Sequence, residues 1–250
     1  MDSKERFTNR VEHYVKYRPS YPKEAVDFLY HEVGFAQRGT IADVGSGMGI
    51  FTRLLLMRGS AVYAVEPNRA MREAAEMALG SFERFYSREG SAEQTGLPDR
   101  SVDHIVSAQA FHWFDIPLAK REFSRIVRPG GKVALIWNSR LTDGDGFSEG
   151  YERLLNRYAN DYGRVNHKHI GPAEFESFFR GGYRKAEFPN HQEFDFEQLK
   201  GRLLSSSYVP LPGEKNYEPM LEALIDLYDH FQVDGRVAFR YVTEIYYGEV

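Results

Sequence analysis

The sequence contains no cysteine among its 250 residues. This absence excludes disulfide bonds, thiolate metal sites, a cysteine nucleophile and the cysteine ligands of iron–sulfur clusters. Long apolar runs are also absent, since none approaches the roughly 20 residues of a membrane-spanning helix. The first ten residues, MDSKERFTNR, lack the apolar core of a signal peptide. We therefore expect a cytoplasmic protein that does not contact a membrane.

An excess of positive charge is lacking as well. The chain has 32 Lys and Arg residues against 36 Asp and Glu, which gives a formal net charge of -4. A nucleic-acid-binding surface requires a concentrated positive field, so we expect no nucleic-acid partner. With 42% hydrophobic residues, the chain is long enough to bury a core as one domain. The composition leaves the oligomeric state open between a monomer and a homodimer.

The sequence does contain an alternation of short apolar segments with helix-forming segments. Strands are expected at 40–44, 61–65, 82–86, 102–107 and 132–137, and helices at 50–58, 69–79 and 116–127. Apolar strands that alternate with helices are typical of a parallel sheet covered on both faces. The predicted fold is α/β: a Rossmann-like, doubly wound, mostly parallel seven-stranded sheet. Residues 236–247 are expected to form an antiparallel C-terminal strand at its edge.

The remaining segments are predicted to extend this sheet within a single domain, 1–250. Two N-terminal helices are expected within 1–35, one at 4–16 and one at 22–33. The core sheet occupies 36–138, and ligands of such sheets bind at the carboxyl ends of the strands. Helical lid or substrate insertions are expected at 139–182 and 196–235, and closing strands at 183–195 and 236–250. A long helix is expected at 217–231.

A glycine-rich turn follows the first strand of the core. The segment IADVGSGMG contains Gly45, Gly47 and Gly49, and glycines in such a turn let the backbone approach a ligand closely. A dinucleotide site requires the spacing G-x-G-x-x-G. In the two possible frames, the third glycine would fall at Ile50 or at Thr52. The loop therefore disfavours a nicotinamide-dependent oxidoreductase, which we keep as an alternative.

Two acidic residues accompany this loop. Asp43 lies two positions before Gly45, and a carboxylate there suits a ligand that carries an ammonium and a sulfonium better than it suits a pyrophosphate. Glu66 ends the second strand, where an acid accepts hydrogen bonds from both hydroxyls of a ribose. Dinucleotide and S-adenosylmethionine sites share this feature, so Glu66 alone does not distinguish them. A solvated acid at a strand end is the other interpretation of Glu66.

Five segments carry a more specific resemblance. In this order and spacing, DVGSGMG, VEPN, SAEQTGLP, FHWFD and RPGG resemble the class I S-adenosylmethionine-dependent methyltransferase family. Within it, the chain resembles the small-molecule branch that includes trans-aconitate methyltransferase-like proteins, over about residues 10–138. The resemblance implies S-adenosyl-L-methionine as cofactor and in-line methyl transfer to a small-molecule acceptor. The acceptor atom is an oxygen or nitrogen nucleophile, with a carboxylate among the candidates.

The resemblance assigns the methionine part of the cofactor to the glycine loop. Gly45, Ser46 and Gly47 would pass beneath it, and Gly49 belongs to the same loop. Asp43 would support the loop or face the amino group.

The adenosine part is assigned to the next two strand ends. Glu66 would hold the ribose. The adenine would lie against residues after the second and third strands, namely Pro67, Asn68, Ser91, Ala92 and Glu93. Asn68 has a second interpretation as a helix cap only. The family most often has an acid at the position of Ser91, so this contact is in doubt.

The resemblance also assigns residues around the transferring methyl group. Gln109 follows the fourth strand and is expected near it. Tyr14 and Arg18 would close over the cofactor, where Arg18 is suited to pair with its carboxylate. Arg18 as a surface charge is the alternative.

His112 is the candidate general base, because an imidazole titrates near neutrality. Its alternative role is a hydrogen bond that holds the turn Phe111–Phe114. Trp113, Asn138 and Arg140 are candidate substrate contacts, with packing as the favoured alternative for Trp113, and Arg140 would suit a carboxylate. We expect no metal site, because His167 and His169 are two residues apart without an acidic cluster. A non-catalytic S-adenosylmethionine-binding protein is the remaining alternative function.

Overall fold

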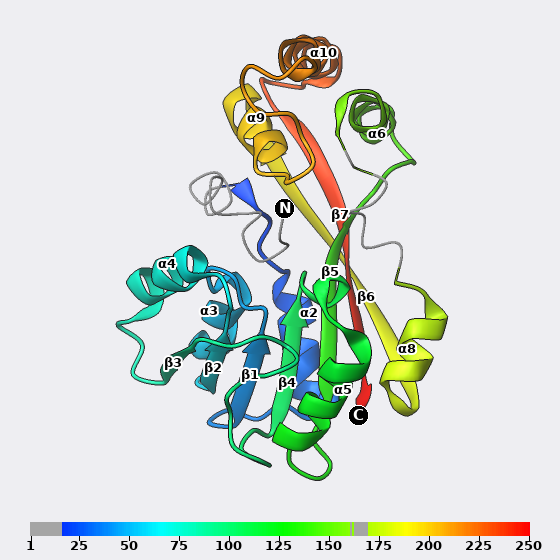
Figure 1. Ribbon diagram of the computed structural model, residues 1–250. Coiled ribbons are helices and arrows are strands. Elements are labelled where there is room, and N and C mark those ends of the chain that lie inside the picture. Colours follow the sequence, from blue (N-terminus) through cyan, green and yellow to red (C-terminus); the bar gives the residue numbers. More distant parts are fainter. Residues whose placement is uncertain (1–16, 161, 163–169) are drawn as a thin grey trace.

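The computed structural model describes residues 17–160, 162 and 170–250. A seven-stranded sheet runs through the protein in the order β3-β2-β1-β4-β5-β7-β6 (Figure 1). Strands β1 to β5 are parallel, and β7 is antiparallel to both β5 and β6. The strands are β1 (Thr40–Val44), β2 (Ala61–Val65), β3 (Phe85–Arg88), β4 (His104–Ala108), β5 (Val133–Arg140), β6 (Arg180–Phe194) and β7 (Val237–Glu249). The predicted fold class is confirmed.

Helices cover both faces of this sheet, as expected for a doubly wound fold. Phe123 of α5 and Phe178 of α8 belong to the core on one face. Leu29, after α2, and Leu55 of α3 belong to the core on the other. The helices are α2 (Lys23–Phe28), α3 (Ile50–Met57), α4 (Arg69–Leu79), α5 (Ile116–Ile126), α6 (Gly146–Tyr158), α8 (Pro172–Phe178), α9 (Phe196–Leu204) and α10 (Tyr217–Phe231), with a π-helical turn Leu29–Val33 and a 3₁₀ turn Phe111–Trp113.

Local signals located several elements correctly. The bounds of β1, β2, α4 and α10 are those predicted. The side chain of Asn68 accepts a hydrogen bond from the Met71 N–H (3.1 Å), and Asp115 accepts one from the Leu118 N–H (3.1 Å). These caps satisfy backbone donors that a helix cannot satisfy internally. The predicted helix at 4–16 lies outside the described residues, whereas the one at 22–33 forms as α2 and the π-helical turn, ending at Gly34.

The predicted position of the C-terminal strand at the sheet edge was wrong. β7 pairs with β5 on one side and with β6 on the other, so β6 is the edge. β6 continues without a break through Pro189, which lies opposite Val242. An edge strand tolerates proline because one of its sides needs no donor. β5 extends to Arg140, since its pairing with β7 continues to Tyr241.

β6 and β7 extend well past the carboxyl ends of the parallel strands (Figure 1). Around these extensions pack α6, α9 and α10, which we call the distal helices. Tyr151, Leu199, Leu224 and Phe239 belong to their shared apolar core. The bounds of α9 were not predicted within the expected insertion 196–235, although its Asp195 cap accepts the Gln198 N–H at 2.8 Å. Within the described ranges, no helix is both long and apolar enough to span a membrane.

Candidate functional site

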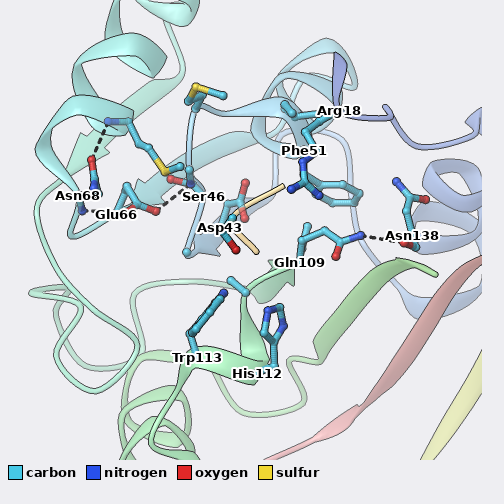
Figure 2. A pocket seen from close by; sticks show the side chains of 18 of the residues that line it. Arg18, Asp43, Ser46, Phe51, Glu66, Asn68, Gln109, His112, Trp113 and Asn138 are labelled. Atoms are coloured by element: carbon cyan, nitrogen blue, oxygen red, sulfur yellow. Dashed lines mark hydrogen bonds between the residues drawn. The ribbon is translucent and has the colours of Figure 1, made fainter. Parts of the chain in front are cut away.

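A pocket of about 270 Å³ opens at the carboxyl ends of the parallel strands (Figure 2). It extends from the glycine loop after β1 to residues of α9 and the turn that follows it. Most predicted site residues line it: Arg18, Asp43, Gly45, Ser46, Gly47, Glu66, Pro67, Asn68, Ser91, Ala92, Glu93, Gln109, His112, Trp113, Asn138 and Arg140. Tyr14 lies outside the described residues. The topology therefore brings predicted residues from six regions of the chain to one cavity.

The glycine loop requires its glycines for different reasons. Gly45 has a φ of 73°, and a Cβ there would lie 2.4 Å from Cβ of Ala110. Gly49 has a φ of 81°, and its Cβ would lie 2.4 Å from Cδ1 of Leu79 in α4. Gly49 does not line the pocket, contrary to its predicted place among the cofactor contacts; it packs α3 against α4 instead. Gly45 keeps the loop close to the strand end of β4.

Glu66 ties the loop to the end of β2 (Figure 2). Its Oε2 accepts a hydrogen bond from the Gly47 N–H (2.9 Å), and its Oε1 accepts one from the Asn68 N–H (2.8 Å). Burial raises the pKa of this carboxyl, and the two backbone donors oppose that shift. Each carboxylate oxygen can accept a further hydrogen bond. The carboxylate is thus held in place, with capacity left for ligand hydroxyls.

One carboxylate oxygen of Asp43 accepts no hydrogen bond from the described residues. Its Oδ2 accepts from the Thr52 hydroxyl (2.6 Å), whereas its buried Oδ1 has no hydrogen-bond partner there. Burial raises the pKa of Asp43 to about 7. The buried hydroxyl oxygen of Ser46 is likewise without a partner in the described part. Buried polar groups are normally paired, so these two atoms fit a polar ligand with a donor, such as an ammonium.

The residues assigned to adenine are held by local hydrogen bonds. The Ser91 N–H donates to the Gln94 carbonyl (3.0 Å), and the carboxylate of Glu93 accepts from the Asp115 N–H (2.9 Å). Ala92 is buried. Asn68 both caps α4 and lines the pocket, so its two interpretations are compatible.

Gln109 adopts a strained backbone at the end of β4, with a φ of 62°. Such conformations in non-glycine residues concentrate at functional sites. Its N–H donates to the Ile136 carbonyl (2.8 Å), and its side-chain amide donates to the Asn138 carbonyl (3.3 Å). The side chain of Asn138 donates to the Ser20 carbonyl (3.2 Å) and accepts from the Thr243 hydroxyl (2.5 Å). Asn138 thereby joins β5, β7 and the N-terminal segment at the pocket.

His112 and Trp113 form a 3₁₀ turn on the opposite side of the pocket from the glycine loop (Figure 2). The indole N–H of Trp137 donates to Nδ1 of His112 at 3.4 Å. A neutral imidazole that accepts at Nδ1 carries its proton on Nε2. In this tautomer His112 presents a donor, whereas a general base needs an unprotonated nitrogen directed at the acceptor.

The cations of the pocket differ in their surroundings. Arg140 is paired with Glu152, and its guanidinium also donates to the Tyr162 hydroxyl (3.0 Å). Arg18 donates to the Ser205 carbonyl (3.1 Å). A third cation, Arg202 of α9, also lines the pocket and was missed by the sequence analysis. A signal was present, since Arg202 falls between Leu199 and Leu203 on the buried face of the helix.

Comparison with known proteins shows which family the core of the chain resembles. Residues 42–135 match the family model described as a methyltransferase domain. An uncharacterized methyltransferase of Mycobacterium tuberculosis is 40% identical over 134 residues, which are 54% of this chain and 52% of that protein. The chain therefore matches about half the length of this curated relative. An uncharacterized methyltransferase of Schizosaccharomyces pombe is 27% identical over 248 residues, covering 97% of this chain and 96% of that protein.

A solved structure shares the whole fold. It is a protein from Anaeromyxobacter dehalogenans named as a type II methyltransferase, with a TM-score of 0.69 and 24% sequence identity. The superposition covers 93% of this chain and 97% of that chain. The distal helices and the two antiparallel strands are therefore part of the shared architecture.

Proposed function

We propose that this chain, whose residues 42–135 match a methyltransferase domain, is a class I S-adenosylmethionine-dependent methyltransferase. It would transfer the methyl group of this cofactor to a small-molecule acceptor in the pocket described above. The acceptor is proposed to be small because the pocket, which is lined by residues from the sheet ends and from α9, has a volume of only about 270 Å³. A chain with a net charge of -4 also offers little attraction to nucleic acids.

The distribution of charge along the pocket is the observation that carries this proposal. Asp43 at the end of β1 and Glu66, which accepts from the Gly47 N–H, lie at the glycine loop. Arg140, which is paired with Glu152 of α6, and Arg202 of α9 line the pocket toward the distal helices. The cofactor carries a sulfonium and an ammonium, which acidic groups attract in a partly buried site. The acidic end therefore suits the cofactor, and the basic end is left for the acceptor.

In this proposal the protein binds the cofactor and the acceptor and aligns them for methyl transfer. The bound cofactor supplies the activated methyl group. Glu66 would accept hydrogen bonds from the ribose hydroxyls, and Oδ1 of Asp43 would accept from the ammonium. Alignment of the two reactants is the main contribution that a protein can make to such a displacement, at most about 7–11 kcal/mol. Gln109, whose backbone is strained at the strand end, would contact the cofactor beside the reacting centre.

We propose that His112 orients the acceptor through its Nε2–H and does not remove a proton. Support comes from the Trp137 hydrogen bond to Nδ1, which favours the tautomer with a protonated Nε2. An acceptor that is already ionised at neutral pH, such as a carboxylate, needs no base. The earlier assignment of His112 as a base stays a prediction for acceptors that must lose a proton.

Calorimetric titration tests the cofactor first. The ligands are S-adenosylmethionine, S-adenosylhomocysteine and NAD, and the variants are Glu66→Ala and Glu222→Ala. Glu222 is an exposed acid of α10, so its variant controls for the loss of one charge. We expect micromolar binding of the first two ligands, lost in Glu66→Ala and retained in Glu222→Ala. Binding of NAD alone would support the oxidoreductase alternative and overturn the proposal.

Turnover separates a methyltransferase from a non-catalytic binding protein. The measurement is release of S-adenosylhomocysteine in the presence of a panel of small acids, phenols and amines. Cofactor binding without turnover of any acceptor would favour the non-catalytic alternative.

A further inference from the structure

Arg202 is a buried cation at the end of the pocket distant from the glycine loop. Only 6% of its surface is exposed, yet it lines the pocket. Its Nε donates to the Tyr241 hydroxyl (3.2 Å), and its Nη1 donates to the hydroxyls of Ser206 (3.2 Å) and Ser205 (3.5 Å). The guanidinium lies over the ring of Phe239, at 5.3 Å from the centroid. All of these partners are neutral.

No carboxylate pairs with Arg202 among residues 17–160, 162 and 170–250. The Nη2 group, with two N–H donors, forms no hydrogen bond to any of them either. Arg140 in the same pocket differs, since Glu152 neutralises it. Arg140 and Arg202 therefore differ: Glu152 neutralises the charge of Arg140, whereas no described carboxylate neutralises the charge of Arg202.

A buried charge without a counter-ion is costly, because neutral hydroxyls replace only part of its hydration. The surrounding groups nevertheless hold the guanidinium in one position. Tyr241 donates its own proton to the side chain of Gln192 (2.9 Å), so its oxygen is directed to accept from Arg202. These neutral groups fix the position of the Arg202 guanidinium without neutralising its charge. An anionic ligand in the pocket would supply the missing charge.

We propose that Arg202 binds a carboxylate of the acceptor through its Nη2 donors; this inference rests on the proposed methyltransferase function. Arginine is suited to this task because its planar fork matches the two oxygens of a carboxylate. The site thereby selects acidic acceptors over neutral ones. The earlier assignment of a carboxylate to Arg140 is replaced in this proposal, since Glu152 already occupies that guanidinium.

The test measures carboxylate binding separately from cofactor binding. Wild-type protein is saturated with S-adenosylhomocysteine and titrated calorimetrically with succinate, glutarate, succinamide and inorganic phosphate. We expect binding of at least one dicarboxylate and none of succinamide. Binding of phosphate but of neither dicarboxylate overturns the assignment to a carboxylate. Absence of S-adenosylhomocysteine binding is a failure of the proposed function and is seen before any acid is added.

Two substitutions assign the binding to Arg202. In Arg202→Met the affinity for the dicarboxylate should fall by about ten- to hundredfold, the value of one or two charged hydrogen bonds. Its affinity for S-adenosylhomocysteine should stay within about twofold, which also reports that the protein is folded. Arg236→Met, at an exposed arginine, is the matched control and should change neither affinity.

Arg202→Lys covers the case in which the methionine variant does not fold. This variant keeps the buried charge but loses the planar fork, so it should bind S-adenosylhomocysteine normally and the dicarboxylate at least about tenfold more weakly. Equal dicarboxylate affinity in wild type and in the folded variant overturns the proposal.

Discussion

Gly201 of α9 packs directly against the aromatic ring of Tyr17. A Cβ added at Gly201 would lie 2.1 Å from Cε2 of that ring. Next to it, Arg18 donates to the Ser205 carbonyl just after the same helix, and the side chain of Gln192 in β6 donates to the Tyr17 carbonyl (3.4 Å). The N-terminal segment is therefore attached to the distal helices, and residues of both line the pocket.

The first prediction concerns this contact. Gly201→Ala should destabilise the protein by about 1–3 kcal/mol through overpacking and should weaken S-adenosylhomocysteine binding, because Tyr17 and Arg18 must shift. In a Tyr17→Ala background the same change should stabilise the protein by about 0.5–1 kcal/mol, since alanine is the better helix former. Urea unfolding of the four proteins measures this cycle. Equal effects of Gly201→Ala in both backgrounds would show that the contact has no energetic role.

The second prediction distinguishes two effects of adding a Cβ to a glycine, which are backbone strain and a steric clash with a neighbouring atom. Gly45 and Gly96 have nearly the same φ, at 73° and 71°, but of these two positions only at Gly45 would a Cβ lie within 4 Å of another atom. Gly96→Ala should therefore cost only the backbone strain, about 1–2 kcal/mol. Gly45→Ala should cost more and should abolish S-adenosylhomocysteine binding. Adding Ala110→Gly to Gly45→Ala removes the colliding atom and should restore part of the affinity; no recovery would refute the steric explanation.

The third prediction follows from the pKa of Asp43, which burial raises from 3.8 to about 7. The folded protein holds this proton more tightly than the unfolded chain, so the group stabilises the fold fully below pH 3.8. That stabilisation is lost as the pH rises to about 7, by at most about 1.4 kcal/mol per pH unit. Asp43→Asn should remove this part of the pH dependence. Urea unfolding of both proteins at pH 5 and pH 8 tests it.

Ligand binding should show the opposite trend. A cationic ligand favours the ionised form of Asp43, so the affinity for S-adenosylmethionine should rise with pH across the region near 7. The affinity of Asp43→Asn should be at least about tenfold weaker at pH 8, as expected when a charged hydrogen bond is lost. A wild-type pH profile identical to that of Asp43→Asn would separate Asp43 from ligand binding.

The fourth prediction concerns the tautomer of His112. Because Trp137 donates to Nδ1, nitrogen chemical shifts of the neutral ring should show the proton on Nε2. Trp137→Phe removes the donor and should increase the population with the proton on Nδ1. With an acidic acceptor, His112→Gln should lower turnover by less than about tenfold, whereas loss of a general base costs about 10²–10⁴. A loss in that higher range would restore His112 as the base.

Much of this protein was determined by its sequence alone, where the information is local. The apolar runs of β1 and β2 and the caps Asn68 and Asp115 specify their elements through neighbouring backbone groups. The glycine loop and Glu66 were recognisable because a ligand site at a strand end needs a fixed spacing along the chain. These features located the acidic end of the pocket.

The tertiary structure decided what depends on pairing between distant segments. No local sequence pattern predicts that β7 lies between β5 and β6. A strand with alternating apolar and polar residues is compatible with either an edge or an interior position of a sheet. Likewise, Arg140 and Arg202 are both arginines in the sequence, and only the fold places Glu152 beside the first and neutral hydroxyls around the second. Charge compensation acts through space, so the chemistry of the basic end could be inferred only from the folded chain.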